Sequence, residues 1–402
     1  MQTVEIEGKS LYSVFQPIYS FSNQACIGAE VLVRGKSIVT EANIPINECL
    51  REPQGMSKVD FARQLNRMHL MNWKQSKPSQ SWVFLNLDFH NVHSLDDLCL
   101  KEILDQLDFS GHEIVVEVVE SEIKDEQLFE NIVSILRDLG CLIALDDFGA
   151  GHSNVDRIWK AQPDIVKLDR QVLLEATKSL RSQSILRNLT KLIQQSGSVS
   201  LLEGIETQEQ AMLAMHVGVD LVQGFYFATP EETFSHLKKG EDLVKDVTER
   251  YPEYANEKKF VENIQKRGYE ALFDRLTELI SAEEIETEMT KVSAMSFVKR
   301  FFILDMEGYQ ISEESEVSGF STKKHDLLKK GKGLCWKNRR YFVKALDRPM
   351  ELYVSEPYRS LIDMQLCLTV SKIITLKSGE RFVACFDVFY HDKSTSSIQI
   401  SI

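Results

Sequence analysis

From the start of the chain to about residue 235, short apolar runs alternate with longer amphipathic segments. Apolar runs of this length, rich in Val, Ile and Leu, are typical of parallel strands buried on both faces. They lie at residues 82–87, 114–119, 141–146, 164–168, 198–203 and 220–224. Between them, Leu128–Leu139 and Ser182–Gln195 show helical spacing, and Gly140 and Gly197 stand where helix C-caps are expected. This alternation predicts a (β/α)₈ barrel or a doubly wound sheet.

The position of polar residues along these runs favours the barrel. Nearly every strand candidate carries a polar residue at or near its carboxyl end. In a barrel all such ends surround one mouth, so these side chains would converge. They are Glu30, Asn86, Glu117, Asp146 with Asp147, Lys167, Glu203 and Gln223. The sequence contains no G-x-G-x-x-G or P-loop motif that would support a nucleotide-binding open sheet.

Five of these strand-end residues are carboxylates, and their shared mouth would be unstable without cations. Oxygen ligands with one amide suit Mg²⁺ or Mn²⁺ better than zinc. The adjacent Asp146 and Asp147 can serve two ions, which is the usual arrangement for in-line phosphoester displacement. Lys167 would add positive charge for a phosphate or orient a water, and Glu203 is the best general-base candidate. The residues alone thus indicate a phosphodiester hydrolase.

After Pro230 the pattern of apolar and charged residues changes. Two charged helices, Lys238–Arg250 and Glu257–Ile280, are expected as a connecting pair. Beyond them we expect a small α+β domain with an antiparallel sheet, because short β-like runs are separated by turn signals. Those runs are Arg300–Leu304, Arg340–Val343, Met364–Val370 and Arg381–Phe389. The predicted domains are residues 1–240, 241–290 and 291–402.

Charge and cysteine usage exclude several other classes of protein. The net charge of −13 argues against a protein that coats a nucleic acid polymer or an anionic membrane. No apolar run is long enough to span a bilayer, and the first residues do not resemble a signal peptide. The seven cysteines are scattered and lack a C-x-x-C motif, so neither a zinc knuckle nor a disulfide framework is expected. We therefore expect a cytoplasmic protein.

Seven motifs, in order over residues 10–235, resemble the EAL-domain family of bacterial cyclic di-GMP phosphodiesterases. The signature Glu-Ala-Leu appears as Glu30-Val-Leu32. The remaining motifs are 84-FLNLD-88, 117-EVVES-121, 146-DDFGAGHS-153, 163-PDIVKLD-169, 203-EGIET-207 and 223-QGFYFATP-230. The resemblance implies a modified (β/α)₈ TIM-like barrel. It also implies metal-dependent hydrolysis of cyclic di-GMP to linear pGpG by in-line attack of a metal-activated water.

The same resemblance implies roles for individual residues. Metal ligands are Glu30, Asn86, Glu117 and Asp146, with Asp147 on a second ion; the ions are Mg²⁺ or Mn²⁺. The catalytic positions are Lys167, beside the hydrolytic water, and Glu203, the general base. Substrate-binding positions are Arg34, Gln16 and Gln223. Supporting positions for the loop after Asp147 are Glu120, Glu206, Gly149 and Gly151, and the family ties this loop to homodimer formation.

Several positions depart from the family pattern. Val31 replaces the signature alanine and Val119 replaces a threonine, while Ala150, His152 and Asn154 replace loop residues. None of these is a ligand position, so we expect an active enzyme. Two alternatives stay open: a cyclic di-GMP receptor that binds without hydrolysis and signals through its C-terminal domain, and a different metal-dependent phosphoesterase on the same barrel.

The C-terminal region resembles PAS or Cache-like sensor domains, and the whole layout resembles the YkuI type of EAL protein. By that resemblance four residues line a pocket for a small anionic or polar ligand: Trp336, Arg340, Tyr341 and Tyr358. The alternative is that the aromatic residues belong to the core and the arginines form surface ion pairs.

Overall fold

The computed structural model folds as two compact units, Met1–Ala255 and Asn256–Ile402, here called the barrel unit and the C-terminal unit. The structure describes residues 1–87, 98–118, 126–149, 156–279, 284–285, 287–288, 298–313, 315–316 and 331–390. Each unit is considered by itself below.

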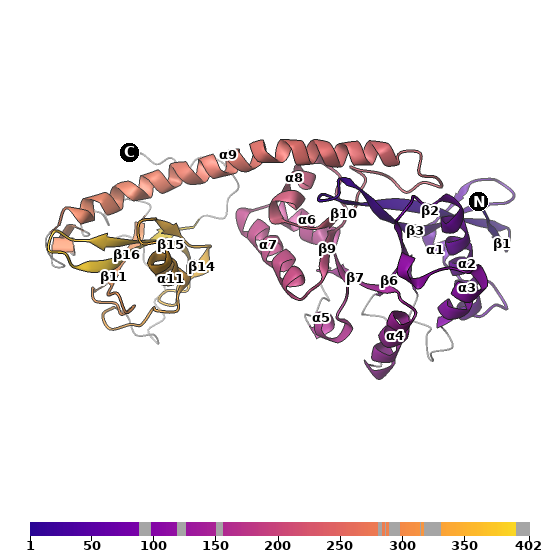
Figure 1. The fold of residues 1–402 in the computed structure, drawn as a ribbon, viewed down its shortest axis with the longest axis horizontal. Coiled ribbons are helices and arrows are strands. Elements are labelled where there is room, and N and C mark those ends of the chain that lie inside the picture. Colours follow the sequence, from indigo (N-terminus) through magenta and orange to yellow (C-terminus); the bar gives the residue numbers. More distant parts are fainter. Residues whose placement is uncertain are drawn as a thin grey trace. The chain divides into compact units, whose positions relative to one another are not determined.

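The sheet of the barrel unit closes on itself (Figure 1). Eight strands form the ring in the order β2-β10-β9-β8-β7-β6-β5-β3, and β3 pairs back with β2. The eight are β2 Lys9–Ser20, β3 Ala25–Ser37, β5 Trp82–Asn86, β6 Ile114–Val118, β7 Leu142–Phe148, β8 Ile165–Leu168, β9 Val199–Leu202 and β10 Leu221–Val222. Two short strands, β1 Val4–Ile6 and β4 Asn43–Ile44, extend the edges.

The strand β2 makes this barrel a modified one. It runs antiparallel to both of its neighbours, β3 and β10. The other seven strands of the ring pair with one another in parallel. The predicted barrel is confirmed, and the alternative of a doubly wound sheet is wrong because the ring is closed. Every residue of β6 and β8 is buried, as expected for strands covered on both faces.

Helices follow most of the parallel strands and cover the outside of the ring. They are α1 Ile46–Cys49, α2 Lys58–Ser76, α3 Leu100–Leu107, α4 Glu126–Asp138, α5 Asp156–Ala161, α6 Arg170–Ala176, α7 Leu180–Gln195 and α8 Gln208–Val217. The predicted helices at 128–139 and 182–195 correspond to α4 and α7. Gly140 and Gly197 both adopt positive φ, 84° and 91°, which a glycine after a helix end allows without strain.

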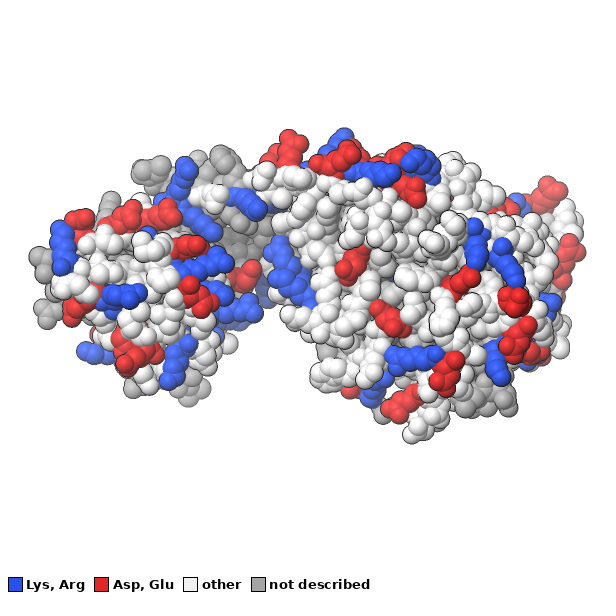
Figure 2. Space-filling model, in the orientation of Figure 1, with Lys and Arg blue, Asp and Glu red and all other residues white. Residues whose placement is uncertain are grey.

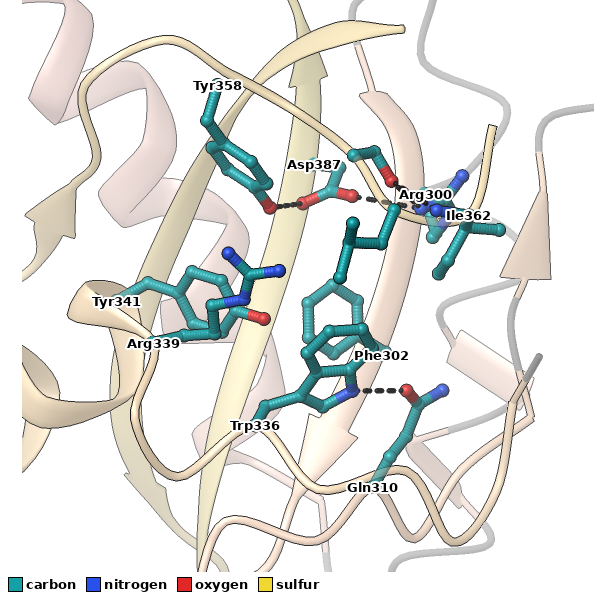
Figure 3. Close-up of a pocket in the computed structure, with 11 residues that line it drawn as sticks. Arg300, Phe302, Gln310, Trp336, Arg339, Tyr341, Tyr358, Ile362 and Asp387 are labelled. Atoms are coloured by element: carbon teal, nitrogen blue, oxygen red, sulfur yellow. Dashed lines mark hydrogen bonds and ion pairs between the residues drawn. The ribbon is translucent and has the colours of Figure 1, made fainter. Parts of the chain in front are cut away.

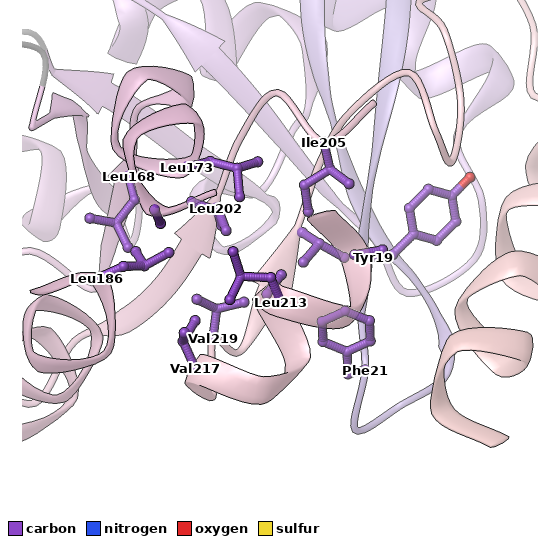
Figure 4. Close-up of a cluster of buried hydrophobic side chains, with 14 of the residues drawn as sticks. Tyr19, Phe21, Leu168, Leu173, Leu186, Leu202, Ile205, Leu213, Val217 and Val219 are labelled. Atoms are coloured by element: carbon purple, nitrogen blue, oxygen red, sulfur yellow. The ribbon is translucent and has the colours of Figure 1, made fainter. Parts of the chain in front are cut away.

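Buried apolar side chains fill the space between the strands and the outer helices in several clusters. Figure 4 shows part of one cluster, in which Leu168 of β8 and Leu202 of β9 face side chains of the helices. Leu186 of α7 and Leu213 of α8 are fully or almost fully buried in the same cluster. The contact follows from sequence spacing, because each helix turns one apolar stripe toward the sheet.

The helix α9, Leu237–Thr277, is one continuous element of 41 residues. The prediction of a connecting helix pair is wrong, because α9 continues through Pro252. Buried Val244 and Val247 join the core of the barrel unit, whereas Phe273 and Leu276 join the core of the C-terminal unit. Apolar packing at both ends therefore outweighs the local penalty of the proline.

The exposed side of α9 carries acidic and basic side chains in alternation (Figure 2). Lys238 pairs with Asp242 at 3.2 Å and Arg250 with Asp246 at 2.9 Å, each one helical turn apart. Within the ranges given above, no helix combines the length and the apolar character needed to cross a membrane.

The C-terminal unit is built on an antiparallel sheet in the order β12-β11-β16-β15-β13, with β14 also paired to β15. Its elements are β11 Val298–Leu304, β12 Ser315–Glu316, α11 Arg340–Asp347, β13 Tyr353–Val354, β14 Tyr358–Arg359, β15 Leu366–Thr375 and β16 Arg381–Phe389. The predicted strands at 300–304 and 381–389 lie in β11 and β16, and the one at 364–370 overlaps β15, which begins at Leu366 and continues to Thr375.

The predicted strand at 340–343 is wrong, because these residues begin helix α11. Tyr341, Phe342 and Ala345 are buried, a spacing that fits one face of a helix. The hydroxyl of Ser371 on β15 donates to the carbonyl of Tyr341 at 2.7 Å and holds the first turn against the sheet. A segment of four residues is too short to distinguish the helical period of 3.6 residues from the strand period of 2 residues.

Candidate active site

The site residues form one layer inside the barrel, directly above an apolar layer. Seven buried side chains from seven strands form a single cluster: Ile18, Phe84, Val115, Ala144, Ile165, Leu201 and Leu221. Residues from all around a closed ring can meet only in its interior. Side chains two positions further along a strand face the same side. Those positions hold Asn86, Glu117, Asp146, Lys167, Glu203 and Gln223. The period of two thus places an apolar floor beneath a polar mouth.

Lys167 lies at the centre of the polar layer. Its ammonium Nζ is 2.6 Å from Glu117 Oε1, 2.7 Å from Glu203 Oε1 and 3.1 Å from Asp146 Oδ1. Glu30 Oε2 lies 3.7 Å away. Four carboxylates from β3, β6, β7 and the end of β9 therefore surround one cation.

Glu30 connects this group to the amides of the layer. Its Oε1 accepts a hydrogen bond from Asn86 Nδ2 at 3.0 Å, and its Oε2 accepts one from Gln223 Nε2 at 2.9 Å. Glu30 stands in the middle of β3, which continues to Ser37, and not near a strand end as expected. Gln16 of β2 is its antiparallel partner in the sheet and lines the same mouth.

Burial and mutual repulsion perturb the acids of this layer. Burial, with the neighbouring Glu30, raises the pKa of Glu117 well above its usual range. Burial likewise raises the pKa of Glu203 to about 8, although the Lys167 ammonium acts in the opposite direction. Burial lowers the pKa of Lys167, but the four carboxylates outweigh it and hold this pKa well above its usual value. Lys167 therefore remains charged at neutral pH.

A local irregularity in β7 lies at the two adjacent aspartates, Asp146 and Asp147. Successive residues of a regular strand face opposite sides. The pairing of β7 with β8 shifts between Leu145 and Phe148, and Asp147 adopts a positive φ of 54°. The Asp147 N–H donates to Asp146 Oδ1 at 2.9 Å. Aspartate tolerates this left-handed conformation better than most residues, so the bulge is compatible with the Asp-Asp sequence.

The donors of this layer fit a hard divalent cation. Four carboxylates face one ammonium, so the layer has an excess of negative charge. Glu117 is completely buried, and its Oε2 accepts no hydrogen bond from the described residues. Carboxylate and amide oxygens are the ligands that Mg²⁺ and Mn²⁺ prefer. In the described part of the chain, however, the acids do not form a ready-made metal cluster, because they converge on Lys167.

The other predicted residues lie at varying distances from this layer. Arg34 lies four residues beyond Glu30 on β3, and its guanidinium NH1 donates to the carbonyl of Val33 at 2.8 Å. Glu206 pairs with Arg170 at 2.9 Å on the rim of the mouth. Gly149 has a φ of 103°, and a Cβ there would lie 2.2 Å from Val172 Cγ2, so only glycine fits. Glu120 and Gly151, with the loop changes Ala150, His152 and Asn154, lie outside the described residues.

The structure also adds residues to the mouth that sequence reasoning missed. A pocket of about 240 Å³ is lined by Gln16, Glu30 and Glu203, and also by Arg170, Gly204 and Phe225. Phe225 is 60% exposed although it is a large aromatic side chain. Its place directly after the Gln-Gly pair of a site motif was the available signal.

Comparison with known proteins agrees with this architecture. The family model of the EAL domain matches residues 1–230. YkuI of Bacillus subtilis (strain 168), described as an uncharacterized EAL-domain containing protein, is 25% identical over 378 residues, which cover 89% of this chain and 90% of YkuI. RocR of Pseudomonas aeruginosa, a cyclic di-GMP phosphodiesterase, is 28% identical over 229 residues, covering 54% of this chain and 56% of RocR.

Solved structures show the same fold. The crystal structure of Bacillus subtilis YkuI, in complex with substrate c-di-GMP and calcium, matches with a TM-score of 0.76 at 22% identity, covering 94% of this chain and 96% of that one. A manganese and cyclic di-GMP complex of Klebsiella pneumoniae BlrP1 matches with a TM-score of 0.50 at 24% identity, covering 57% and 58%. Since the family model spans more than half of the chain and the fold agrees, this protein belongs to the EAL-domain family.

Proposed function

We propose that the barrel unit hydrolyses cyclic di-GMP to linear pGpG. The observation that carries the proposal is the layer of four carboxylates around Lys167, positioned above a closed apolar floor. Related proteins support the choice of substrate, since RocR is a cyclic di-GMP phosphodiesterase and YkuI was crystallised with cyclic di-GMP.

A divalent cation is part of this proposal. Structures of related proteins contain cyclic di-GMP together with calcium or manganese. We assign Mg²⁺ or Mn²⁺, with two ions per site, to five residues: Glu30, Asn86, Glu117, Asp146 and Asp147. Bound there, the ions would polarise the phosphodiester and make a water easier to deprotonate.

The protein's own side chains carry out the proton transfer and orient the reacting groups. With cations bound beside it, the pKa of Glu203 would fall below about 8, so the ionised carboxylate accepts the proton of the attacking water. Its side chain is still 21% exposed toward the mouth. The water oxygen forms a new bond to phosphorus while the bond to the sugar 3′-oxygen breaks in line, and the departing 3′-oxygen takes up a proton from solvent to become the free hydroxyl of pGpG. Lys167 stays protonated, orients Glu117 and Glu203 through short contacts, and adds positive charge beside the phosphate. Gln223 and Asn86 fix the carboxylate of Glu30 from both sides.

Substrate positioning is assigned to three further side chains. Arg34, with its planar guanidinium, suits a phosphate oxygen pair. Gln16 and Gln223 line the mouth and offer amide groups to the nucleotide. Glu206 and Gly149 support the loop that follows Asp147, with Glu120 and Gly151 as further supporting positions.

We extend the proposal to the organisation of the whole chain. Residues 1–240 form the phosphodiesterase, 241–290 a connecting segment, and 291–402 a PAS or Cache-like regulatory domain. The protein acts in the cytoplasm as a homodimer through its EAL domain, and it lowers the concentration of the second messenger.

The direct test is incubation of the purified chain with cyclic di-GMP, with and without Mg²⁺ or Mn²⁺, followed by chromatography of the nucleotides. Metal-dependent pGpG is the expected result. Intact substrate in every sample, together with tight binding in a titration, would instead favour the receptor that binds without hydrolysis. Intact substrate without binding would contradict both.

A further inference from the structure

The C-terminal unit has a surface pocket at the start of α11, distinct from the barrel mouth. Its volume is about 330 Å³, within the range of small-molecule sites. The first turn of α11, strand β13 and the segment that enters β14 line it. The lining consists of Asn338, Arg339, Arg340, Tyr341, Tyr353, Ser355, Glu356, Pro357 and Tyr358.

A smaller recess adjoins this outer pocket and shares Arg339, Tyr341 and Tyr358 with it; Figure 3 shows the recess. Its volume of about 10 Å³ has room for no more than one water. Several of its polar groups are already paired. Trp336 Nε1 donates to Gln310 Oε1 at 3.0 Å, and Arg300 NH1 donates to Ser360 Oγ at 2.9 Å. The recess is therefore too small for an organic ligand, which has to occupy the larger outer pocket.

Two consecutive arginines give the outer pocket its charge. Neither Arg339 nor Arg340 pairs with a carboxylate among the described residues, whereas the nearby Arg348 pairs with Glu351 at 3.1 Å. The Arg339 guanidinium carbon lies 5.7 Å from the ring centre of Trp336 and 6.0 Å from that of Tyr358. Contacts between a guanidinium and two aromatic rings hold the group in place before any ligand arrives.

The backbone and the aromatic lining add to this arrangement. Arg339 is the N-cap of α11 and makes no side-chain cap hydrogen bond, while the Phe342 N–H donates to the Arg339 carbonyl at 3.0 Å. Tyr353 and Tyr358 are both half-buried and form an apolar wall. Glu356 also lines the pocket. Its negative charge offsets one of the two arginine charges, so Arg339, Arg340 and Glu356 together carry a net charge of +1.

We propose that this pocket binds a small organic anion with an aromatic body. Its carboxylate or phosphate contacts Arg339, Arg340 and the first turn of α11, and its body packs on Tyr353 and Tyr358. Among the residues expected from sequence, Arg340, Tyr341 and Tyr358 line this pocket, while Trp336 lines the adjoining recess. The inference concerns the C-terminal unit alone and does not depend on the reaction of the barrel unit.

The test is calorimetric titration of the full chain with phenyl phosphate, benzoate and inorganic phosphate. EDTA is present throughout, so that divalent ions do not recruit an anion to the barrel mouth. Phenyl phosphate or benzoate should bind with one site per chain, and inorganic phosphate more weakly because it lacks the ring. Tighter binding of phenyl phosphate assigns a phosphate ester, and tighter binding of benzoate assigns a carboxylate.

Substitutions identify the binding site. Arg340→Ala should weaken binding at least about tenfold, the effect expected for one charge-assisted hydrogen bond. Arg339→Ala should also weaken it. Arg348→Ala is the matched control, because this arginine is exposed near the other end of α11 and outside both lining sets. Absence of binding by all three probes would overturn the proposal, as would equal affinities in the Arg340→Ala and Arg348→Ala variants.

Discussion

At the scale of single residues, the environment of Glu203 sets its role. The carboxylate contacts the Lys167 ammonium at 2.7 Å and remains open to the mouth. Glu203→Gln keeps the size of the side chain but removes the base, so turnover should fall by about 10²–10⁴ while cyclic di-GMP still binds. Product chromatography beside a binding titration measures both quantities. A variant as fast as the parent would show that another group takes the proton.

Glu30 offers a test of the assigned metal site. Its two oxygens are held by Asn86 and Gln223, at 3.0 and 2.9 Å. Glu30→Ala should weaken Mg²⁺ or Mn²⁺ binding, because a charged oxygen ligand is lost. Titration of the metal into the variant and the parent gives the comparison, and identical curves would remove Glu30 from the ligand set.

The buried position of His69 predicts that the free energy of unfolding depends on pH, independently of the active site. This residue is buried on α2, its Nδ1 lies 2.9 Å from Ser13 Oγ, and burial lowers its pKa to about 4. A depressed folded-state pKa leaves stability unaffected above about pH 6.5 and reduces it as pH falls toward 4. The loss over this window should approach about 3 kcal/mol.

Urea unfolding at several pH values measures this contribution. In His69→Gln, the difference in unfolding free energy between pH 7 and pH 4.5 should be smaller than in the parent. The exposed His112→Gln serves as the control and should follow the parent curve. If His69→Gln also follows the parent curve, the buried histidine is not the source of the acid sensitivity.

At the scale of elements, α9 contradicts the expectation based on local sequence. Pro252 removes one backbone hydrogen bond from the helix interior, and its position is exposed. Pro252→Ala should therefore stabilise the chain, by up to about 3 kcal/mol. Glu253→Ala, at the next exposed position, is the control and should change stability little. Denaturation followed by helical circular dichroism would detect the difference, and a destabilised Pro252→Ala variant would refute the argument.

Helix α11 is a second case in which the local sequence pattern did not identify the secondary structure. Residues 340–343 are consistent with a strand by composition, yet the burial of Tyr341, Phe342 and Ala345 follows helical spacing. The sheet decides between the two, because β15 offers an apolar face and the Ser371 hydroxyl to the first turn. Longer segments were predicted correctly: α7 and β16 match their expected ranges closely, since their periods repeat often enough to be distinctive.

At the scale of the whole molecule, the two compact units have separate apolar cores. We expect two transitions in differential scanning calorimetry, because no core described here is shared between the units. Phenyl phosphate should shift only the transition of the C-terminal unit, since a ligand stabilises the part that binds it. A single transition that moves as one with the ligand would show that the two units unfold together.

The sequence by itself determined the barrel and the composition of its mouth. Strand spacing of two residues places Glu117 above Val115 and Lys167 above Ile165, and parallel strands bring such positions to one end. These relations depend only on local periodicity, so they could be predicted without coordinates.

Only the tertiary structure decided how those groups meet. The convergence of four carboxylates on Lys167, the position of Glu30 in the middle of β3 and the exposure of Phe225 depend on ring closure and strand register. The continuity of α9 and the pocket around Arg340 depend on packing between segments distant in sequence. Contacts of this kind depend on burial and charge in three dimensions, which no local pattern of residues contains.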